Sequence, residues 1–380
     1  MNGVINHIML ALDSLVKRYI LKLDEPMHGG RYYLHTQDQN KCIIDFSTSV
    51  NPLGASQHVI KAIIDNLIGN SNSITEYPDP YARMLRSSIS KYIGIDEDYI
   101  LVGNGSSEII YTLADVFIKE DDNVAIVEPT FLEYARACKK NGATIKHIMM
   151  SNLKLDYDSI EENIINDNDI KMLFICNPNN PTGILTDGSI ILKVIEYCYN
   201  KGIVVVLDEC FIEFTDEQGY ASKVKEFDNL VVIRSLTKAF GLAGLRIGYC
   251  VSDPRIVKVL SKAKVPWSVN AIAQIAGIKA LSDLEHLNKS KSFIMKEKRF
   301  LINHLRCIQG VNPLESDTNF FLLRLEGFNS KVLKDALLSK GILVRDCSNF
   351  YGMNNSYIRI STRLRDDNIT LIDAIKSILY

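Results

Sequence analysis

Four short segments of this sequence carry residues whose types and spacing could hold a charged ligand and do chemistry on it. The segment Ser235-Leu-Thr-Lys238 places two hydroxyls before a lysine, and Arg246 follows eight residues after the lysine. A lysine amine can form a covalent Schiff base with a carbonyl compound. Hydroxyls and the bidentate guanidinium of arginine suit a phosphate dianion. The segment therefore predicts a nucleophilic lysine beside a phosphate site, although an isolated lysine after a strand is ordinarily an exposed loop residue.

A carboxylate, Asp208, follows the apolar run 203–207. A carboxylate at the end of a buried strand is costly unless it is paired. Opposite a protonated ring nitrogen of a cofactor it would be paired, and it would strengthen the ring as an electron sink. A helix N-cap is the alternative that this residue allows in isolation.

Two polar turns complete the set. In Asn177-Pro-Asn-Asn-Pro-Thr-Gly183, Asn180 could donate its amide to a cofactor oxygen and to a substrate carboxylate, although by composition the segment is only a turn. The segment Gly103-Asn-Gly-Ser-Ser-Glu108 joins a predicted strand to a predicted helix, and the free N–H groups of a helix N-terminus bind anions. It lacks the GxGxxG pattern of a dinucleotide site, so Ser106 and Ser107 favour a single phosphate.

The elements that would position these residues alternate between apolar strands and helices from about residue 57 to 265. Strand candidates are 100–103, 123–127, 144–149, 170–176, 203–208, 230–235 and 246–251. The run 171–176 is apolar after Lys171, and 203–207 is apolar throughout, which is typical of strands buried on both faces of a mainly parallel sheet. Ligand sites in such sheets lie at the carboxyl ends of the strands, where the polar residues above occur.

We expect a large domain over residues 57–268 and a smaller one that joins residues 1–56 to 269–380. Long helices are expected over 270–315. The tail predicts strand 319–325, helix 330–340, strands 342–346 and 357–361, and helix 366–379. The helical spacing of apolar residues over 4–22 predicts an amphipathic helix that packs on the protein or on a partner subunit.

Composition excludes several classes of function. The chain has 380 residues, 47% of them hydrophobic, and a net charge of -2 that gives no reason to expect nucleic acid or an anionic membrane as partner. Its apolar runs fall short of the roughly 20 residues of a membrane span, and its N-terminus does not have the pattern of a signal peptide. The eight cysteines lack the spacing of a metal or redox motif, so we expect reduced thiols, no metal and a cytoplasmic location.

In this order, the four segments resemble those of the fold-type I enzymes that depend on pyridoxal 5′-phosphate (PLP), over nearly the whole chain from about residue 28. The resemblance implies an α/β fold, with a large PLP-binding domain of mainly parallel sheet flanked by helices, a smaller α+β domain, and a homodimer with shared active sites. It implies that Lys238 binds PLP covalently, that Asp208 pairs with the pyridine nitrogen, and that Asn180 binds the phenolate oxygen. The remaining cofactor-binding residues that it implies are Ser106, Ser107, Ser235, Thr237 and Arg246 at the phosphate, Phe131 on the ring, and Tyr77 reaching the phosphate from the neighbouring subunit.

Within that fold, several segments are similar to those of the threonine-phosphate decarboxylases of cobalamin side-chain synthesis. They are His28-Gly-Gly30, the segments 45–54, 266–270 and 345–350, and Phe211, where many aminotransferases have tyrosine. The histidinol-phosphate aminotransferases are close relatives, and both families act on amino compounds that bear a phosphate. The resemblance implies that Arg359 binds the substrate α-carboxylate. Candidates for a substrate phosphate site are His28, Gly29, Gly30, Asn51 and Arg345.

Three functions remain open from the sequence. We expect a decarboxylase of O-phospho-L-threonine or O-phospho-L-serine. An aminotransferase for histidinol phosphate or an aromatic acid is the alternative, against which Phe211 and the His28 segment argue. A PLP-binding regulator is disfavoured, because Lys238 and Asp208 are both present and the segment before residue 28 is too short for a DNA-binding domain. The choice between decarboxylation and transamination depends on how the substrate is oriented, which a sequence does not report.

Overall fold

The computed structural model describes residues 15–23, 29–30, 43–69, 72–165 and 169–380. Its centre is a seven-stranded sheet in which β8 is antiparallel to both neighbours and the other neighbouring strands are parallel. In spatial order the strands are β2 (Ile100–Gly103), β8 (Gly248–Ser252), β7 (Leu230–Ser235), β6 (Val204–Asp208), β5 (Ile170–Cys176), β3 (Asn123–Glu128) and β4 (Thr144–Met149).

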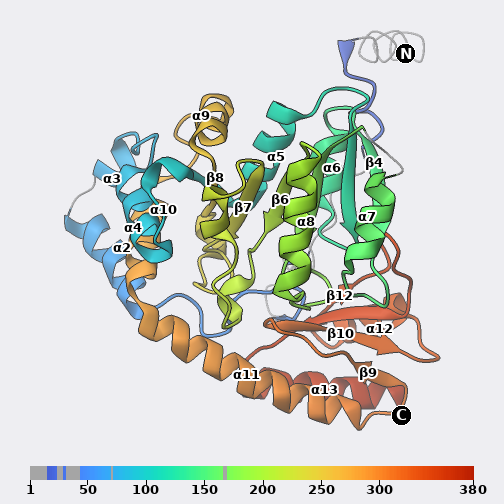
Figure 1. Ribbon diagram of the computed structural model, residues 1–380. Coiled ribbons are helices and arrows are strands. Elements are labelled where there is room, and N and C mark those ends of the chain that lie inside the picture. Colours follow the sequence, from blue (N-terminus) through green and yellow to red (C-terminus); the bar gives the residue numbers. More distant parts are fainter. Residues whose placement is uncertain (1–14, 24–28, 31–42, 70–71, 166–168) are drawn as a thin grey trace, which may run out of the picture.

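The central strands are apolar because helices cover the sheet on both faces (Figure 1). All six residues of β7 are buried, as are six of the seven residues of β5. Helices α5 (Gly105–Phe117) and α6 (Glu133–Lys139) pack side by side, as do α7 (Tyr157–Ile165) and α8 (Gly188–Asn200), and α9 (Pro254–Ala263) packs on α5. The predicted mainly parallel sheet is confirmed, and each predicted strand is present to within about two residues.

A second helical group stands at one edge of the sheet and includes α2 (Gln57–Gly69), α3 (Asn72–Thr75), α4 (Arg83–Ile93) and α10 (Ala271–Ser282). Helix α10 packs on α2 and α4, and its buried Ala273 and Ala276 belong to the larger hydrophobic core. The change to the smaller core falls within α11 (Leu284–Arg306), between Ile294 and Leu301, which is later than the predicted boundary at residue 269.

The smaller core lies under a four-stranded antiparallel sheet in the order β12-β13-β10-β9. Its strands are β12 (Arg345–Asp346), β13 (Tyr357–Ser361), β10 (Phe320–Leu325) and β9 (Val311–Pro313), and its helices are α12 (Ser330–Ser339) and α13 (Arg365–Leu379). The predicted strand 342–346 is divided, because β11 (Ile342–Leu343) pairs instead with β1 (Ile44–Asp45). This pairing attaches the N-terminal segment to the smaller unit.

The predicted helix over 4–22 falls largely outside the described residues. In residues 15–23, only Leu15 is helical, and residues 17–23 form turns in which the N–H of Ile20 donates to the Lys17 carbonyl at 2.9 Å. The helix therefore does not extend to residue 22, and Tyr19 packs instead against Gly142, where a Cβ would come within 3.1 Å of the tyrosine ring. No helix in the described ranges is long and apolar enough to cross a membrane.

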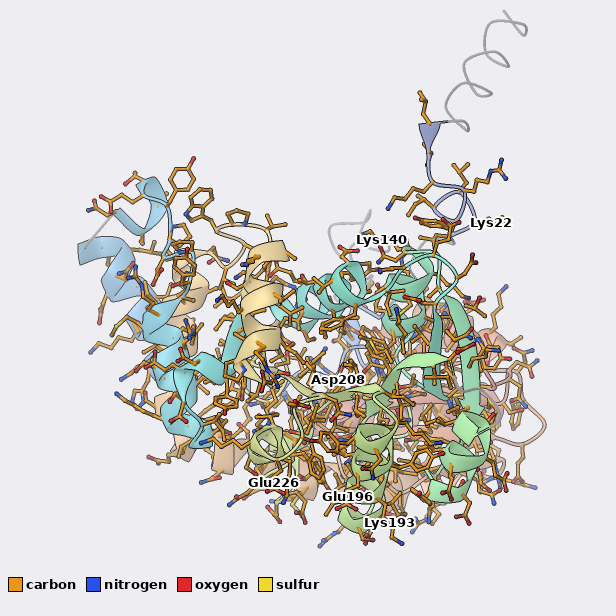
Figure 2. All side chains as sticks on the ribbon, turned by 45° about the horizontal axis from the view of Figure 1, so that its top comes forward. Lys22, Lys140, Lys193, Glu196, Asp208 and Glu226 are labelled. Atoms are coloured by element: carbon orange, nitrogen blue, oxygen red, sulfur yellow. The ribbon has the colours of Figure 1, made fainter. Side chains whose placement is uncertain are left out.

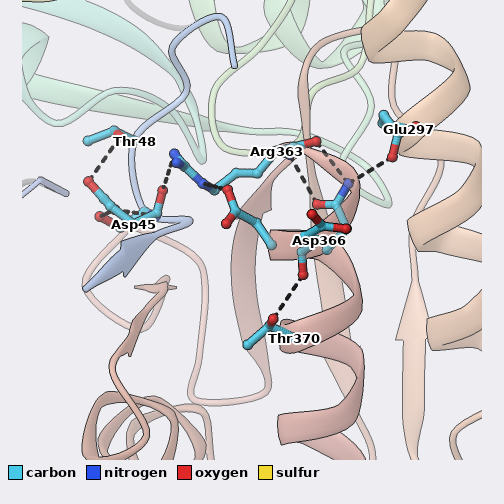
Figure 3. A network of polar contacts seen from close by, with 9 residues as sticks. Asp45, Thr48, Glu297, Arg363, Asp366 and Thr370 are labelled. Atoms are coloured by element: carbon cyan, nitrogen blue, oxygen red, sulfur yellow. Dashed lines mark hydrogen bonds and ion pairs between the residues drawn. The ribbon is translucent and has the colours of Figure 1, made fainter. Parts of the chain in front are cut away.

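Arg363 ties the N-terminal segment to the C-terminal helix (Figure 3). Its guanidinium donates to the Asp45 carbonyl at 3.1 Å and to the Asp367 carboxylate at 2.9 Å. The Asp45 side chain meanwhile accepts from the backbone N–H and the hydroxyl of Ser47, at 2.7 and 2.6 Å, and from the Thr48 hydroxyl at 3.0 Å. Residues 45–48 are thus fixed against the smaller sheet, which matters because they reach the site described next.

A buried ion pair in the same network generates a prediction about stability. Arg365 donates two hydrogen bonds to the buried Glu297 carboxylate, at 2.9 and 2.7 Å, which joins α13 to α11. Removing one partner of a largely buried ion pair leaves the charge of the other partner without a neutralising group. We expect Glu297→Ala to lower the free energy of unfolding by about 2 kcal/mol, a value reduced because Arg365 is partly exposed. Equilibrium denaturation in urea measures it.

The matched control is Asp228→Ala, which removes the partner of Arg255 at 2.6 Å in a pair exposed to solvent. It should cost less than about 1 kcal/mol. Equal losses in the two variants would contradict the structural role assigned to Glu297.

Candidate active site

Eight of the sixteen predicted site residues line one cavity of about 320 Å³. It opens at the carboxyl ends of the parallel strands and is bounded by the smaller unit and by the N-terminal segment. Its lining is Gly29, Ser47, Thr48, Ser49, Val50, Ser107, Phe131, Leu132, Asn180, Phe211, Lys238, Ala243, Arg246, Arg345, Phe350 and Arg359. A larger cavity of about 540 Å³ lies between the 214–217 turn and α11, but its lining mixes cations with carboxylates and contains none of the predicted site residues that the structure describes.

Lys238 follows the end of β7 and points across the face of Phe211, with Nζ 5.8 Å from the ring centroid. The pKa of its ammonium is lowered to about 8, chiefly by burial and also by the nearby Arg359 and Arg246, while Cys210 and Asp208 act in the opposite direction. A pKa this close to neutral leaves a useful fraction of the amine unprotonated. Lys238 is therefore suited to nucleophilic attack.

The predicted phosphate site forms where Arg246 meets the N-terminus of α5. Arg246 has a left-handed backbone conformation (φ 60°), and its guanidinium lies so close to Gly105 that a Cβ there would come within 2.6 Å of Nη2. A Cβ on Gly248 would likewise come within 2.5 Å of the Ser106 nitrogen. The absence of side chains at these two glycines therefore allows the arginine to approach the first turn of α5 closely. The guanidinium and the N–H groups of that turn are together suited to bind an anion.

Two of the hydroxyls assigned to this site are buried beneath the cavity surface and do not line the cavity. Ser235 and Thr237 are buried, and their hydroxyls lie 2.6 Å apart at hydrogen-bonding distance. Neither side chain lines the cavity, whereas Ser107 does. The pair fixes the turn that carries Lys238, because the N–H of Thr237 also donates to the Ser235 oxygen at 3.2 Å.

Asp208 is buried at the end of β6, where its carboxylate accepts two hydrogen bonds. The Tyr134 hydroxyl donates to Oδ2 at 2.7 Å and the Cys210 N–H donates to Oδ1 at 2.9 Å. Figure 2 shows Asp208 in the interior, whereas Lys193 and Glu196 of α8 lie at the outer surface. These two hydrogen bonds fix the position of the carboxylate. The sequence analysis missed Tyr134, whose only signal is its position three residues after Phe131.

Asn180 and Arg359 hold each other at the substrate side of the cavity. The Arg359 guanidinium donates to the Asn180 amide oxygen and, at 2.6 Å, to the Ser47 carbonyl. Because the oxygen of Asn180 is used in this way, its NH₂ group is the donor that it offers to a ligand. Burial lowers the pKa of the Arg359 guanidinium to about 10, so that it is still charged at neutral pH.

The candidates for a substrate phosphate separate into three groups. Arg345 lines the cavity, donates to Asn349 at 2.8 Å and lies 5.0 Å over the ring of Phe350. Gly29 also lines the cavity, and the N–H of Gly30 donates to the Ser47 hydroxyl at 2.8 Å. Gly29 packs so closely on Ser47 that a Cβ would come within 2.4 Å of the serine carbonyl oxygen. His28 lies outside the described residues.

Two predicted residues are not part of this cavity. The Asn51 amide donates to the Ala239 carbonyl and to the Ser290 hydroxyl, each at 2.8 Å, and its oxygen accepts from Leu53. Both N–H groups and the oxygen of this side chain thus have partners within the protein. Asn51 therefore supports the turn that carries Lys238 and is not a ligand of the substrate. Tyr77 is 81% exposed, with its ring 4.9 Å from that of Trp267, and it contributes nothing to the cavity of its own chain.

The donor set fits PLP. An anion site, an aromatic side chain and a lysine of lowered pKa line one cavity. The Asp208 carboxylate, held by two neutral donors, does not line the cavity but is close enough to act on the pKa of the same lysine. In such a cavity Arg246 and the α5 N-terminus would hold the cofactor phosphate, Asp208 the ring nitrogen, and Phe131 one face of the ring. Within the described part of the chain, no cluster of His, Cys, Asp and Glu is arranged to bind a metal ion.

Comparison with known sequences identifies the family. The model of aminotransferase class I and II matches residues 41–375. A protein from Caldanaerobacter subterraneus subsp. tengcongensis with the provisional name threonine-phosphate decarboxylase is 34% identical, over 92% of this chain and 93% of that protein. A histidinol-phosphate aminotransferase from Thermoanaerobacter sp. (strain X514) is 37% identical, over 86% of this chain and 91% of that protein.

Solved structures similar to this chain also include both decarboxylases and aminotransferases. The L-threonine-O-3-phosphate decarboxylase from Porphyromonas gingivalis is 31% identical and superposes with a TM-score of 0.76, over 88% of this chain and 98% of that one. The histidinol-phosphate aminotransferase from Sinorhizobium meliloti, solved in complex with PLP, has a TM-score of 0.85 over 96% of this chain and 97% of that one. At 21% identity it bears on the fold alone. This chain belongs to the class I and II aminotransferase family, whose enzymes use PLP, and it has the fold-type I architecture.

Proposed function

We propose that this protein is a PLP-dependent lyase that removes the carboxylate of O-phospho-L-threonine, or of O-phospho-L-serine, to give an amino-alcohol phosphate for cobalamin side-chain synthesis. The observation that carries the proposal is the charge of the cavity. Among the described residues that line it are three arginines and a lysine, but no aspartate or glutamate. A substrate with both a carboxylate and a phosphate gives each arginine an anion once the cofactor phosphate is counted.

The positions of the arginines support this assignment. Arg246 belongs to the anion site at the N-terminus of α5 and serves the cofactor phosphate. Arg359 holds Asn180, the residue assigned to the cofactor's phenolate oxygen, and so lies where an α-carboxylate would be next to the reacting carbon. Arg345 lies beside Phe350 and remains for the substrate phosphate. Bidentate guanidinium anchors at both ends would fix the torsion about Cα, which selects the bond that breaks.

Phe211 further favours the lyase over an aminotransferase. Its ring lies under the Lys238 amine and packs edge-on against Phe320, with centroids 4.9 Å apart. A hydroxyl of the kind that many aminotransferases place here is absent from the residue. When bound, PLP supplies an electron sink for the bond broken at Cα. In its protonated form, Lys238 is placed to return a proton to that carbon.

The alternative is a histidinol-phosphate aminotransferase, which the 37% identity to the Thermoanaerobacter enzyme favours. The two functions share the fold, the cofactor and a phosphate-bearing substrate. They differ in a property that is simple to measure, because an aminotransferase requires a keto acid as amino acceptor and a decarboxylase does not.

We expect the purified protein reconstituted with PLP to release CO₂ from O-phospho-L-threonine without any keto acid and to form aminopropanol phosphate. CO₂ trapping together with mass spectrometry of the product measures this. The control is Lys238→Ala, which should lose turnover because it lacks the amine. No CO₂, with turnover of histidinol phosphate only when 2-oxoglutarate is added, would establish the aminotransferase.

A second prediction concerns the substrate phosphate. We expect Arg345→Gln to raise the KM for O-phospho-L-threonine by about 10- to 100-fold, the usual effect of losing hydrogen bonds to a charged group. PLP content, read from its absorbance, should be unchanged, since Arg345 is assigned to the substrate. An unchanged KM would remove Arg345 from the site.

We also propose that the protein is a homodimer with shared active sites. Large apolar side chains are exposed on α2, α3 and α4 and on the 265–267 turn, whose Trp267 lies against Tyr77. The three helices group at one edge of the molecule (Figure 1). The exposed side chains include Ile68, Ile74, Tyr77, Met84 and Trp267. An apolar surface this extended is typical of an interface between protein chains. A second copy on this surface would bring its Tyr77 toward the neighbouring cavity, as the family resemblance implies.

Sedimentation equilibrium should therefore give the mass of two chains, and Met84→Glu should shift the equilibrium toward monomer by placing a charge in the contact. The matched control is Val332→Glu on α12, which changes a similarly exposed residue of the smaller unit. A monomeric wild-type protein, or equal effects of the two variants, would refute the interface.

A further inference from the structure

The 347–353 loop, which leaves the strand carrying Arg345, is docked on the end of β4 in the larger unit. The ring of Tyr351 stacks on that of His147, with centroids 3.6 Å apart and planes 8° from parallel. Next to it, Gly352 lies so close to Met149 that a Cβ would come within 2.1 Å of the methionine methyl carbon. We refer to these four residues, His147, Met149, Tyr351 and Gly352, as the clasp.

On the side of the smaller unit, the clasp continues directly into the cavity. Phe350, which precedes Tyr351, lines the cavity and lies under the Arg345 guanidinium at 5.0 Å. Asn349 accepts from Arg345 at 2.8 Å. Two residues that contact this arginine therefore immediately precede the ring stacked on His147, and a shift of that ring would displace them.

On the side of the larger unit, the clasp continues into the loop that holds the cofactor ring. Nδ1 of His147 lies 3.3 Å from Oε1 of the buried Glu128, at hydrogen-bonding distance. The other oxygen of Glu128 accepts from the Thr130 N–H at 2.8 Å, directly before Phe131. Leu132, the next residue, packs with Phe350 in one small apolar cluster, and both line the cavity.

From these contacts we propose that His147 and Tyr351 are positioning residues for the phosphate end of the substrate. Their stack joins the loop that orients Arg345 to the loop that carries Phe131, so the distance between the substrate phosphate and the cofactor is set by a contact outside the cavity. The proposal rests on the proposed function only in assigning Arg345 to a phosphate, and it applies equally to an amino substrate with another phosphate ester. Neither residue touches the reacting atoms.

The expected size of the effect follows from the contact. Aromatic pairs add about two- to tenfold to an equilibrium constant beyond their buried area. Tyr351 is half exposed, so its removal leaves no cavity in the core and does not threaten the fold. The loss should therefore fall on the alignment of Arg345 and not on global stability.

Tyr351→Ala should raise the KM for the phosphorylated substrate by about two- to tenfold while kcat changes by less than about twofold. Amide hydrogen exchange in residues 347–353 should become faster even in the protein without PLP, because the loop has lost its anchor. Tyr351→Phe keeps the ring and should restore both values. His147→Ala should match Tyr351→Ala, and the double variant should add little to either, as expected for one shared contact.

Unchanged KM and unchanged exchange in Tyr351→Ala would overturn the proposal, as would a failure of Tyr351→Phe to restore them. These variant-to-wild-type ratios are measured with whichever phosphate ester the wild-type protein turns over, O-phospho-L-threonine alone or histidinol phosphate with 2-oxoglutarate. If the proposed function is wrong, the wild-type protein will not decarboxylate O-phospho-L-threonine. If the role of the clasp is wrong, the variant-to-wild-type ratios of KM and of hydrogen exchange will not differ from one.

Discussion

The site depends on keeping cationic side chains together without neutralising them. Like charges in one cavity repel each other, and a buried charge without a partner is costly. The protein meets this constraint by holding Arg359 and Arg246 with neutral oxygens, those of Asn180, Ser47 and Ala243. Such acceptors solvate a guanidinium but leave its charge for an incoming anion. The low pKa of Lys238 is a consequence of the same environment.

The contrast with Arg234 shows that this arrangement is specific to the cavity. Arg234 is also buried, at the end of β7, but it pairs with the Glu209 carboxylate at 2.8 Å and lies 3.8 Å from Glu213. The pKa of Glu213 is raised to about 7, chiefly by burial and also by the Glu209 carboxylate, while Arg234 acts in the opposite direction. Buried arginines thus occur here in two settings: Arg234 faces carboxylates and supports the framework, whereas Arg359 in the cavity is held by neutral oxygens. The difference lies in the residues that face each guanidinium and not in its depth.

The sequence predicted the sheet well because its signals are local. Continuous apolar runs mark β5 and β6, and the polar residues that follow them fall at the carboxyl ends by the geometry of parallel strands. Side-chain partners are a different matter, since they depend on residues far along the chain. Asn51 was placed among the substrate ligands, but Ser290 and Ala239 consume its amide, and neither residue is marked in the sequence as its neighbour. Tyr134 was overlooked for the same reason, because its role exists only through Asp208 on another strand. The split of 342–346 into β11 and β12 likewise reflects two different partners for one predicted strand.

The anion sites are distributed over separate parts of the molecule. Arg246 and the α5 N-terminus belong to the larger unit, Arg345 and Arg359 to the smaller sheet, and Ser47 with Gly29 to the N-terminal segment that Asp45 and Arg363 hold against that sheet. A ligand with a single anionic group would engage only one of these parts. A ligand with an anion at each end, bound next to the cofactor, would connect them all, and its binding free energy would then stabilise their relative positions as well as its own contacts. The division of the cationic residues between the units therefore supports the proposal of a substrate with two anionic groups, independently of which bond at Cα is broken.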